Sequence, residues 1–185
     1  GSGQGTGTAE DIALNAEGVL TGAYIDSNNT LHGYVRATNG TITSINAPGA
    51  GTGPGQGTDV DGINLGGVIP GIYIDSSGVD HGFVRAPDGT FTEFDVPNAG
   101  MGSGQGTVPE GLNVAGAITG TYIDTSSVDH GFLRNPHGAI TTFDVPGAGT
   151  GAGQGTFPLL NNVEGTITGY DIDNNGVAHA FIRTP

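Results

Sequence analysis

The chain has 185 residues, with 37 glycines, 10 prolines, no cysteine, and only four Lys and Arg residues against 18 Asp and Glu residues. Its net charge of −14 argues against a nucleic-acid partner, because neutralising phosphates requires Lys and Arg. The lack of cysteine excludes disulfides and thiolate-bound metals, and no apolar run approaches the ~20 residues of a membrane-spanning helix.

One unit occurs four times along the chain. Equivalent His, Arg and Asp residues recur every 49 residues. The copies cover about 1–50, 51–99, 100–148 and 149–185 of a single repeat domain, residues 1–185. The first copy carries three extra residues between Gln4 and Asn15, which predicts a tolerant loop there.

Each copy is predicted to form four strands. In the second copy we expect them near 58–64, 68–75, 79–86 and 90–96. Glycine-containing turns separate them, with Gly available for positive φ. Helix is disfavoured, because glycine recurs every few residues and no 3.6-residue apolar stripe persists.

The predicted fold is therefore all-β, built from four tandem four-stranded antiparallel units and propeller-like, since blade repeats run ~40–50 residues. The alternative is a linear stack of β-sheets in a fibre. The small residues Gly22, Gly71, Gly120 and Gly169 are expected to let neighbouring sheets approach closely. The Gly-x-Gly strings near 51–57 are interpreted as flexible connections between units.

The fourth copy stops at Pro185, before its fourth strand. An unpaired strand edge is an association site, so we expect a homo-oligomer or homopolymer, with filaments as one form.

The segments His81-Gly-Phe83, His130-Gly-Phe132 and especially His179-Ala-Phe181, with Phe94-Asp-Val-Pro97 and Phe143-Asp-Val-Pro146, resemble the HAF-type extracellular repeats of bacterial proteins. The resemblance covers all four copies. It implies a secreted or cell-surface, propeller-like array without an established catalytic role.

The most prominent candidate residues form a ladder that is repeated once per copy: His32, His81, His130 and His179, with Arg36, Arg85, Arg134 and Arg183. The favoured interpretation is a structural network in which each Arg pairs with a carboxylate such as Asp75 or Asp95. The other interpretation is a ring of sites for an anionic or sugar ligand.

Two further site types are considered. We expect no cofactor, and the alternative is a calcium site. Its candidate ligands are Asp26, Asp75, Asp124, Asp171 and Asp173. The simpler interpretation of these residues is turn capping. Asn28 and Asn39 begin N-glycosylation sequons.

No catalytic residue stands out. The sequence predicts a non-catalytic, extracellular, structural or adhesive repeat protein that self-assembles through its incomplete last unit. A lectin-like module with glycan partners is the second hypothesis, and a carbohydrate-active enzyme is the third.

Overall fold

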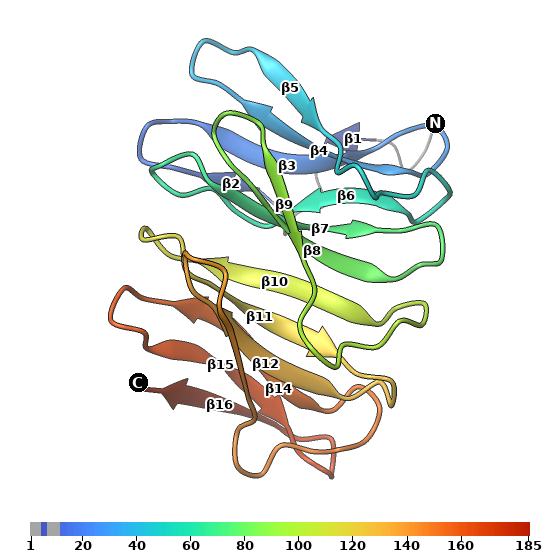
Figure 1. The fold of residues 1–185 in the computed structure, drawn as a ribbon, viewed down its shortest axis with the longest axis vertical. Helices are drawn as coiled ribbons and strands as arrows, with labels where there is room; N and C mark the ends of the chain where they lie inside the picture. The colour runs from blue at the N-terminus through green and yellow to red at the C-terminus, as the bar shows by residue number, and fades with distance from the viewer. Residues whose placement is uncertain (1–4, 7–11) are drawn as a thin grey trace.

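The computed structural model describes residues 5–6 and 12–185 and contains 16 β-strands (Figure 1). No helix occurs in this part of the chain, and so none of its segments is a helix that could cross a membrane. The predicted all-β class and the tandem repeat are confirmed. Most of the expected loop insertion, residues 7–11, lies outside the described residues.

The strands fall into four consecutive units, which we call blades. The first blade holds β1 (Gly5–Thr6), β2 (Ala13–Leu14), β3 (Leu20–Ile25), β4 (Leu31–Arg36) and β5 (Ile42–Ile45). The second holds β6 (Gly57–Val60), β7 (Ile69–Ile74), β8 (Asp80–Arg85) and β9 (Phe91–Phe94). The third holds β10 (Gly106–Leu112), β11 (Ile118–Ile123), β12 (Asp129–Arg134) and β13 (Ile140–Phe143). The fourth holds β14 (Gly155–Asn161), β15 (Ile167–Ile172) and β16 (Ala178–Arg183).

Pairing within each blade is antiparallel, as predicted, and β1 and β2 together take the place of one strand beside β3. Successive blades are joined by a single parallel pair, which is Leu31 with Gly57, then Asp80 with Gly106, then Asp129 with Gly155. The array is open: its strand order begins at β1 and ends at β16 without closing. In Figure 1 the first and fourth blades lie at opposite ends of the long axis.

The expected strand positions in the second blade agree with β7, β8 and β9 to within two residues. The first strand of this blade was expected to reach residue 64, but β6 ends at Val60. The equivalent strands β10 and β14 are longer, because each continues past a register shift. Asp61 nevertheless donates its backbone N–H to the carbonyl of Pro70, so the chain stays close to β7 beyond the strand end.

The hydrophobic core lies between blades. One cluster joins Ile45 and Ala47 of the first blade to Ile69, Tyr73 and Phe83 of the second. A second cluster joins Phe94 and Val96 of the second blade to the third-blade side chains Ile118, Tyr122 and Phe132. Each blade therefore buries its apolar face only by stacking against a neighbour, as expected for a repeat array.

Three of the glycines predicted to admit the neighbouring blade, Gly71, Gly120 and Gly169, face residues of their own blade instead. A Cβ on Gly71 would overlap the Asp59 carbonyl and the Phe83 ring, both within the same blade. The close approach between blades occurs instead at Gly82, where a Cβ would lie 3.1 Å from Thr107 Cγ2 of the next blade. This glycine is the middle residue of the His-Gly-aromatic motif.

The glycine-rich connections are also not the flexible links expected from the sequence. The Gln56 carboxamide accepts the Gly53 N–H at 2.8 Å and donates to the Ser76 carbonyl at 3.1 Å. Gly51 and Gly55 donate backbone N–H groups to Ile74 and Asn29. Glycine is needed here because a Cβ at Gly51 would overlap the Gln56 carboxamide. The loop between the first two blades therefore has a defined conformation, stabilised by the Gln56 side chain and by backbone hydrogen bonds.

Candidate functional site

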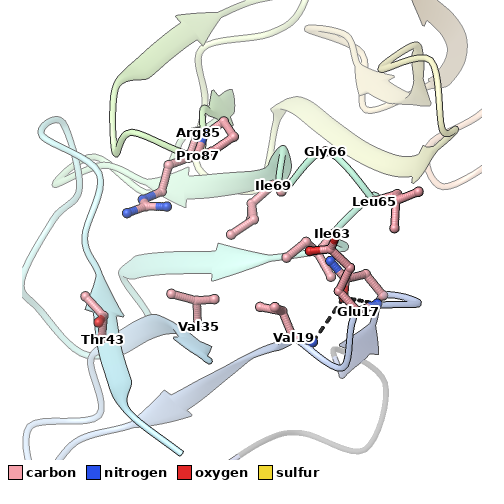
Figure 2. A pocket seen from close by; sticks show the side chains of 12 residues that line it. Glu17, Val19, Val35, Thr43, Ile63, Leu65, Gly66, Ile69, Arg85 and Pro87 are labelled. Atoms are coloured by element: carbon pink, nitrogen blue, oxygen red, sulfur yellow. Dashed lines mark hydrogen bonds between the residues drawn. The ribbon is translucent and has the colours of Figure 1, made fainter. Parts of the chain in front are cut away.

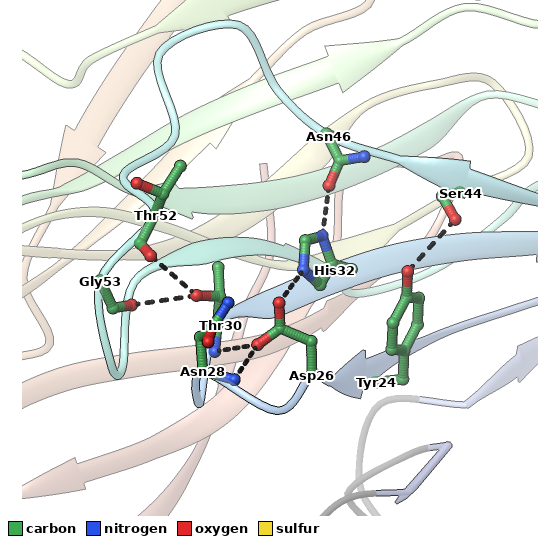
Figure 3. A network of polar contacts seen from close by, with 9 residues as sticks. All are labelled: Tyr24, Asp26, Asn28, Thr30, His32, Ser44, Asn46, Thr52 and Gly53. Atoms are coloured by element: carbon green, nitrogen blue, oxygen red, sulfur yellow. Dashed lines mark hydrogen bonds and ion pairs between the residues drawn. The ribbon is translucent and has the colours of Figure 1, made fainter.

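Each blade places its repeated histidine near the start of a strand, beside the aspartate of the preceding turn, and Figure 3 shows the first of them. His32 Nδ1 donates to Asn46 Oδ1 at 2.6 Å, and His32 Nε2 lies 3.2 Å from Asp26 Oδ2. The other oxygen of Asp26 accepts the backbone N–H groups of Asn28 at 2.8 Å and Thr30 at 3.0 Å. One carboxylate therefore caps the turn and orients the imidazole.

The second and third blades carry a second carboxylate in place of Asn46. His81 Nδ1 lies 3.0 Å from Asp95, and its Nε2 lies 3.7 Å from Asp75. In the third blade the corresponding partners of His130 are Asp144 at 2.9 Å and Asp124 at 3.6 Å. In the fourth blade His179 has Asp173 alone, at 3.4 Å.

A tyrosine stacks on the histidine in three blades. The ring centroids of Tyr73 and His81 are 4.8 Å apart, and the Tyr73 hydroxyl donates to Glu93 at 3.2 Å. Burial, together with the nearby Glu93 charge, raises the pKa of Tyr73 to about 12. In the fourth blade Asp171 stands at this position, as the cross-strand partner of His179.

Four of the five carboxylates proposed from sequence as calcium ligands act as turn caps, namely Asp26, Asp75, Asp124 and Asp173. Asp171 instead lies within β15. The Thr30 N–H lowers the pKa of Asp26, the Val79 N–H lowers that of Asp75, and the Val177 N–H lowers that of Asp173 to about 2. Burial acts to raise the pKa of Asp124, but the Val128 and Ser126 N–H groups, together with His130, lower this pKa overall. Among the described residues, no three His, Asp or Glu side chains are grouped to hold a metal ion.

At Arg134 and Arg183 an aromatic ring takes the place of the carboxylate expected from sequence. The ion pairs found within the described ranges join a histidine and an aspartate. The Arg134 guanidinium instead lies 4.9 Å from the ring centre of Phe94, and Arg183 lies 4.7 Å from that of Phe143. Both of these arginines reach the preceding blade and stack on the ring at the end of its fourth strand. Burial lowers the pKa of Arg134.

Arg85 differs from these two arginines, because the preceding blade has Ile45 where the later blades have Phe94 and Phe143. Its side chain borders a pocket of about 330 Å³ between the first two blades. Figure 2 shows the apolar side chains Val35 and Ile69 lining this pocket beside Arg85.

A polar pocket lies at the opposite end of the strands. It measures about 490 Å³ and is bordered by two glycine-rich loops, with Gln56, Ser76, Ser103 and Asp80 among its lining residues. Burial raises the pKa of Asp80 to about 6. The same shift to about 6 occurs at Asp129, the equivalent residue one blade further on, again because of burial.

An asparagine ladder links the blades, and its repetition at the same spacing was visible in the sequence, although its role was not. The amide of Asn15 donates to the Asn64 carbonyl at 3.2 Å, and that of Asn113 donates to the Asn162 carbonyl at 3.0 Å. The side-chain oxygen of Asn113 caps its own turn, accepting the N–H groups of Ala115 and Ala117. The Asn113 side chain thus stabilises its own turn and forms a hydrogen bond to the next blade.

Replacing Asn113 with aspartate is expected to lower the free energy of unfolding by about 2 kcal/mol, since the turn acceptor stays while the donor to the next blade is lost. Chemical denaturation measures this. Asn162→Asp is the matched control: its oxygen also accepts a turn N–H, from Thr166, but the residue is exposed. An equal loss in both variants would show that the link between blades contributes nothing.

The two candidate glycosylation residues, Asn28 and Asn39, are both exposed in turns of the first blade. The Thr30 hydroxyl of the first sequon is buried and donates to the Thr52 carbonyl at 2.9 Å. In the second sequon, Asn39 accepts the Thr41 N–H at 2.9 Å.

In comparisons with known proteins, no protein-family model matches this chain, and no curated protein matches it either.

Proposed function

We propose that this chain is a non-catalytic, extracellular structural or adhesive repeat protein that associates with copies of itself through the edge of its fourth blade. The observation that carries the proposal is the pairing of β16. Within the described residues, β16 pairs only with β15, whereas β4, β8 and β12 each pair with a fourth strand of their own blade. An edge with unpaired backbone groups favours pairing with a strand from another chain.

The side chains of this edge support the same proposal. Val177 and Ile182 are 50% and 70% exposed, and no Lys or Pro occurs within β16 to discourage pairing. Ala180 stands where the other blades have glycine. At the equivalent Gly131, a Cβ would lie 2.8 Å from the Phe143 ring of the fourth strand. An incoming strand therefore fits best with a smaller residue opposite Ala180.

The test is to supply the strand within the same chain. A copy of residues 39–45 added after Pro185 continues the repeat in register and places the Ile45 equivalent opposite Ala180, as Ile45 lies opposite Gly33. It omits the Asn46–Pro48 equivalents, so it supplies the fourth strand without the Ala47 side chain that packs on a following blade. At the equivalent Gly33, a Cβ would lie 3.3 Å from Ile45 Cβ, which a small adjustment relieves. Sedimentation velocity is expected to show concentration-dependent association of the 185-residue chain and a monomer for the extended chain.

The control carries proline in place of the Thr43 and Ile45 equivalents of the added segment, which removes its ability to pair. This control should associate like the original chain. If the original chain sediments as a monomer at every concentration and the extension changes nothing, the proposal is wrong.

A lectin-like role is the second candidate, and the polar pocket beside Asp80 favours it. Serine hydroxyls, the Gln56 amide and a carboxylate border the same space, and these groups can bind the hydroxyls of a sugar. A glycan array tests this role. Saturable binding that is lost in Asp80→Asn would support a lectin-like role, and the absence of binding to any glycan on the array would contradict it.

A further inference from the structure

The first blade presents an uncovered groove on the side that faces away from the second blade. It measures about 490 Å³ and is lined by Leu20, Tyr24, Tyr34, Arg36, Ile42 and Ser44. Ile42 is 60% exposed, and Arg36 is also exposed. No segment among the described residues fills this space as a neighbouring blade fills the later ones.

The equivalent groove of the second blade is filled. Its counterparts Ile69, Tyr73 and Phe83 are 1%, 7% and 0% exposed, because Ile45 and Ala47 of the first blade pack into it. Both residues come from the end of a fourth strand and the residues that follow it, which we call the strand-end segment.

The third and fourth blades repeat this occupancy. Phe94 and Val96 of the second blade pack against Ile118, Tyr122 and Phe132 of the third. In the fourth blade the Phe143 ring lies edge-on to Phe181, with centroids 6.4 Å apart, and Arg183 covers it. Three of the four grooves in the chain thus hold the same kind of segment.

The strand-end segment has a common chemistry. An apolar residue, a polar residue, a second apolar residue and a proline follow one another in Ile45–Pro48, Phe94–Pro97 and Phe143–Pro146. The polar residue turns back to its own blade, as Asp95 does to His81. The backbone N–H of the second apolar residue donates to a threonine of the next blade, as Val96 does to Thr107 Oγ1 at 2.9 Å.

We propose that the first-blade groove is a binding site for an extended segment of another polypeptide with the pattern aromatic-Asp-Val-Pro. The aromatic side chain lies over Tyr34 and under the Arg36 guanidinium, as Phe94 lies against Phe132 and Arg134. Tyr34 stands where the filled grooves have phenylalanine, which places a hydroxyl in the one groove that is open. The acidic residue of the segment faces away from the groove.

The probe is a labelled synthetic peptide with the sequence of residues 140–148, and the readout is fluorescence anisotropy with the 185-residue chain at a concentration where it is monomeric. Saturable binding is expected. Ile42→Glu should weaken binding at least about tenfold, because it places a carboxylate in the apolar groove. The substitution is at an exposed side chain, so the blade should still fold.

The matched control is Ile182→Glu, at a similarly exposed side chain on β16. This variant should bind the peptide as the parent chain does. Loss of binding in Ile182→Glu but not in Ile42→Glu would show that the peptide completes β16 instead, and the groove proposal would be wrong. A peptide with aspartate at the Phe143 and Val145 positions should not bind, and equal binding of both peptides would also overturn the proposal.

Peptide binding and self-association concern opposite ends of the array. The groove proposal does not depend on the proposed function, and the Ile42→Glu and Ile182→Glu variants distinguish binding in the groove from completion of β16.

Discussion

Gly106→Ala should lower the free energy of unfolding by about 3–4 kcal/mol, the largest loss that we expect from a single methyl group in this chain. Gly106 opens β10 with a φ of +131°, and a Cβ there would overlap the Asp80 carbonyl of the preceding blade. That carbonyl belongs to the one parallel pair that joins the second and third blades. Relieving the overlap means moving a backbone and separating the blades. Urea unfolding monitored by circular dichroism measures the loss.

Gly104→Ala is the matched control for backbone strain. Gly104 also has a positive φ, +73°, but no atom lies within 4 Å of a Cβ placed on it. Alanine at this position should cost only about 1 kcal/mol, the penalty of the left-handed conformation itself. If the two variants lose the same stability, the contact between blades at Gly106 is not the reason that glycine is needed.

Asp129→Asn should stabilise the protein at pH 7, by about 1–2 kcal/mol. Asp129 is 7% exposed, and its backbone N–H donates to the Gln154 carbonyl. Its carboxylate takes part in none of the ion pairs found among the described residues. Burial, with a further contribution from Asp124 and against that of His130, raises its pKa from 3.8 to about 6. Above pH 6 the folded state therefore holds a buried, ionised carboxylate that the unfolded state exposes to water. Asparagine removes this penalty.

The pH dependence follows with a definite sign. Between about pH 4 and pH 6 the folded state binds more protons at Asp129 than the unfolded state does, so this group makes stability fall as pH rises. The difference in melting temperature between Asp129→Asn and the parent should therefore grow from pH 4.5 to pH 6.5.

The control for the pH series is Asp88→Asn, in an exposed turn where the Thr90 N–H lowers the pKa of the carboxyl. The parent gains stability from such a group as pH rises through the acid range, so its removal should not stabilise the protein at pH 7. A stabilisation equal to that of Asp129→Asn would point to net charge, not burial, as the cause.

The repeat and its strands were predictable because they are local or periodic properties. The turn glycines act over a few residues and the 49-residue period repeats along the chain, and together they led to the all-β class and to most strand positions. The turn-capping interpretation of Asp75 also arose from local spacing, and its carboxylate accepts the N–H groups of Ser77 and Val79.

The partners between blades were not predictable, because they join residues about a whole repeat apart. Sequence favoured a carboxylate for each arginine on charge alone, whereas stacking brings Arg134 over Phe94, and the carboxylates are taken by histidines and turn N–H groups. Similarly, Gly71 and Gly82 look alike in sequence, and only the packed structure shows which of them meets the next blade. The sequence by itself determined what one blade is, since a blade forms from short-range turns and pairing. The tertiary structure decided how blades fit together, since that depends on which faces meet when the apolar side of each blade is buried.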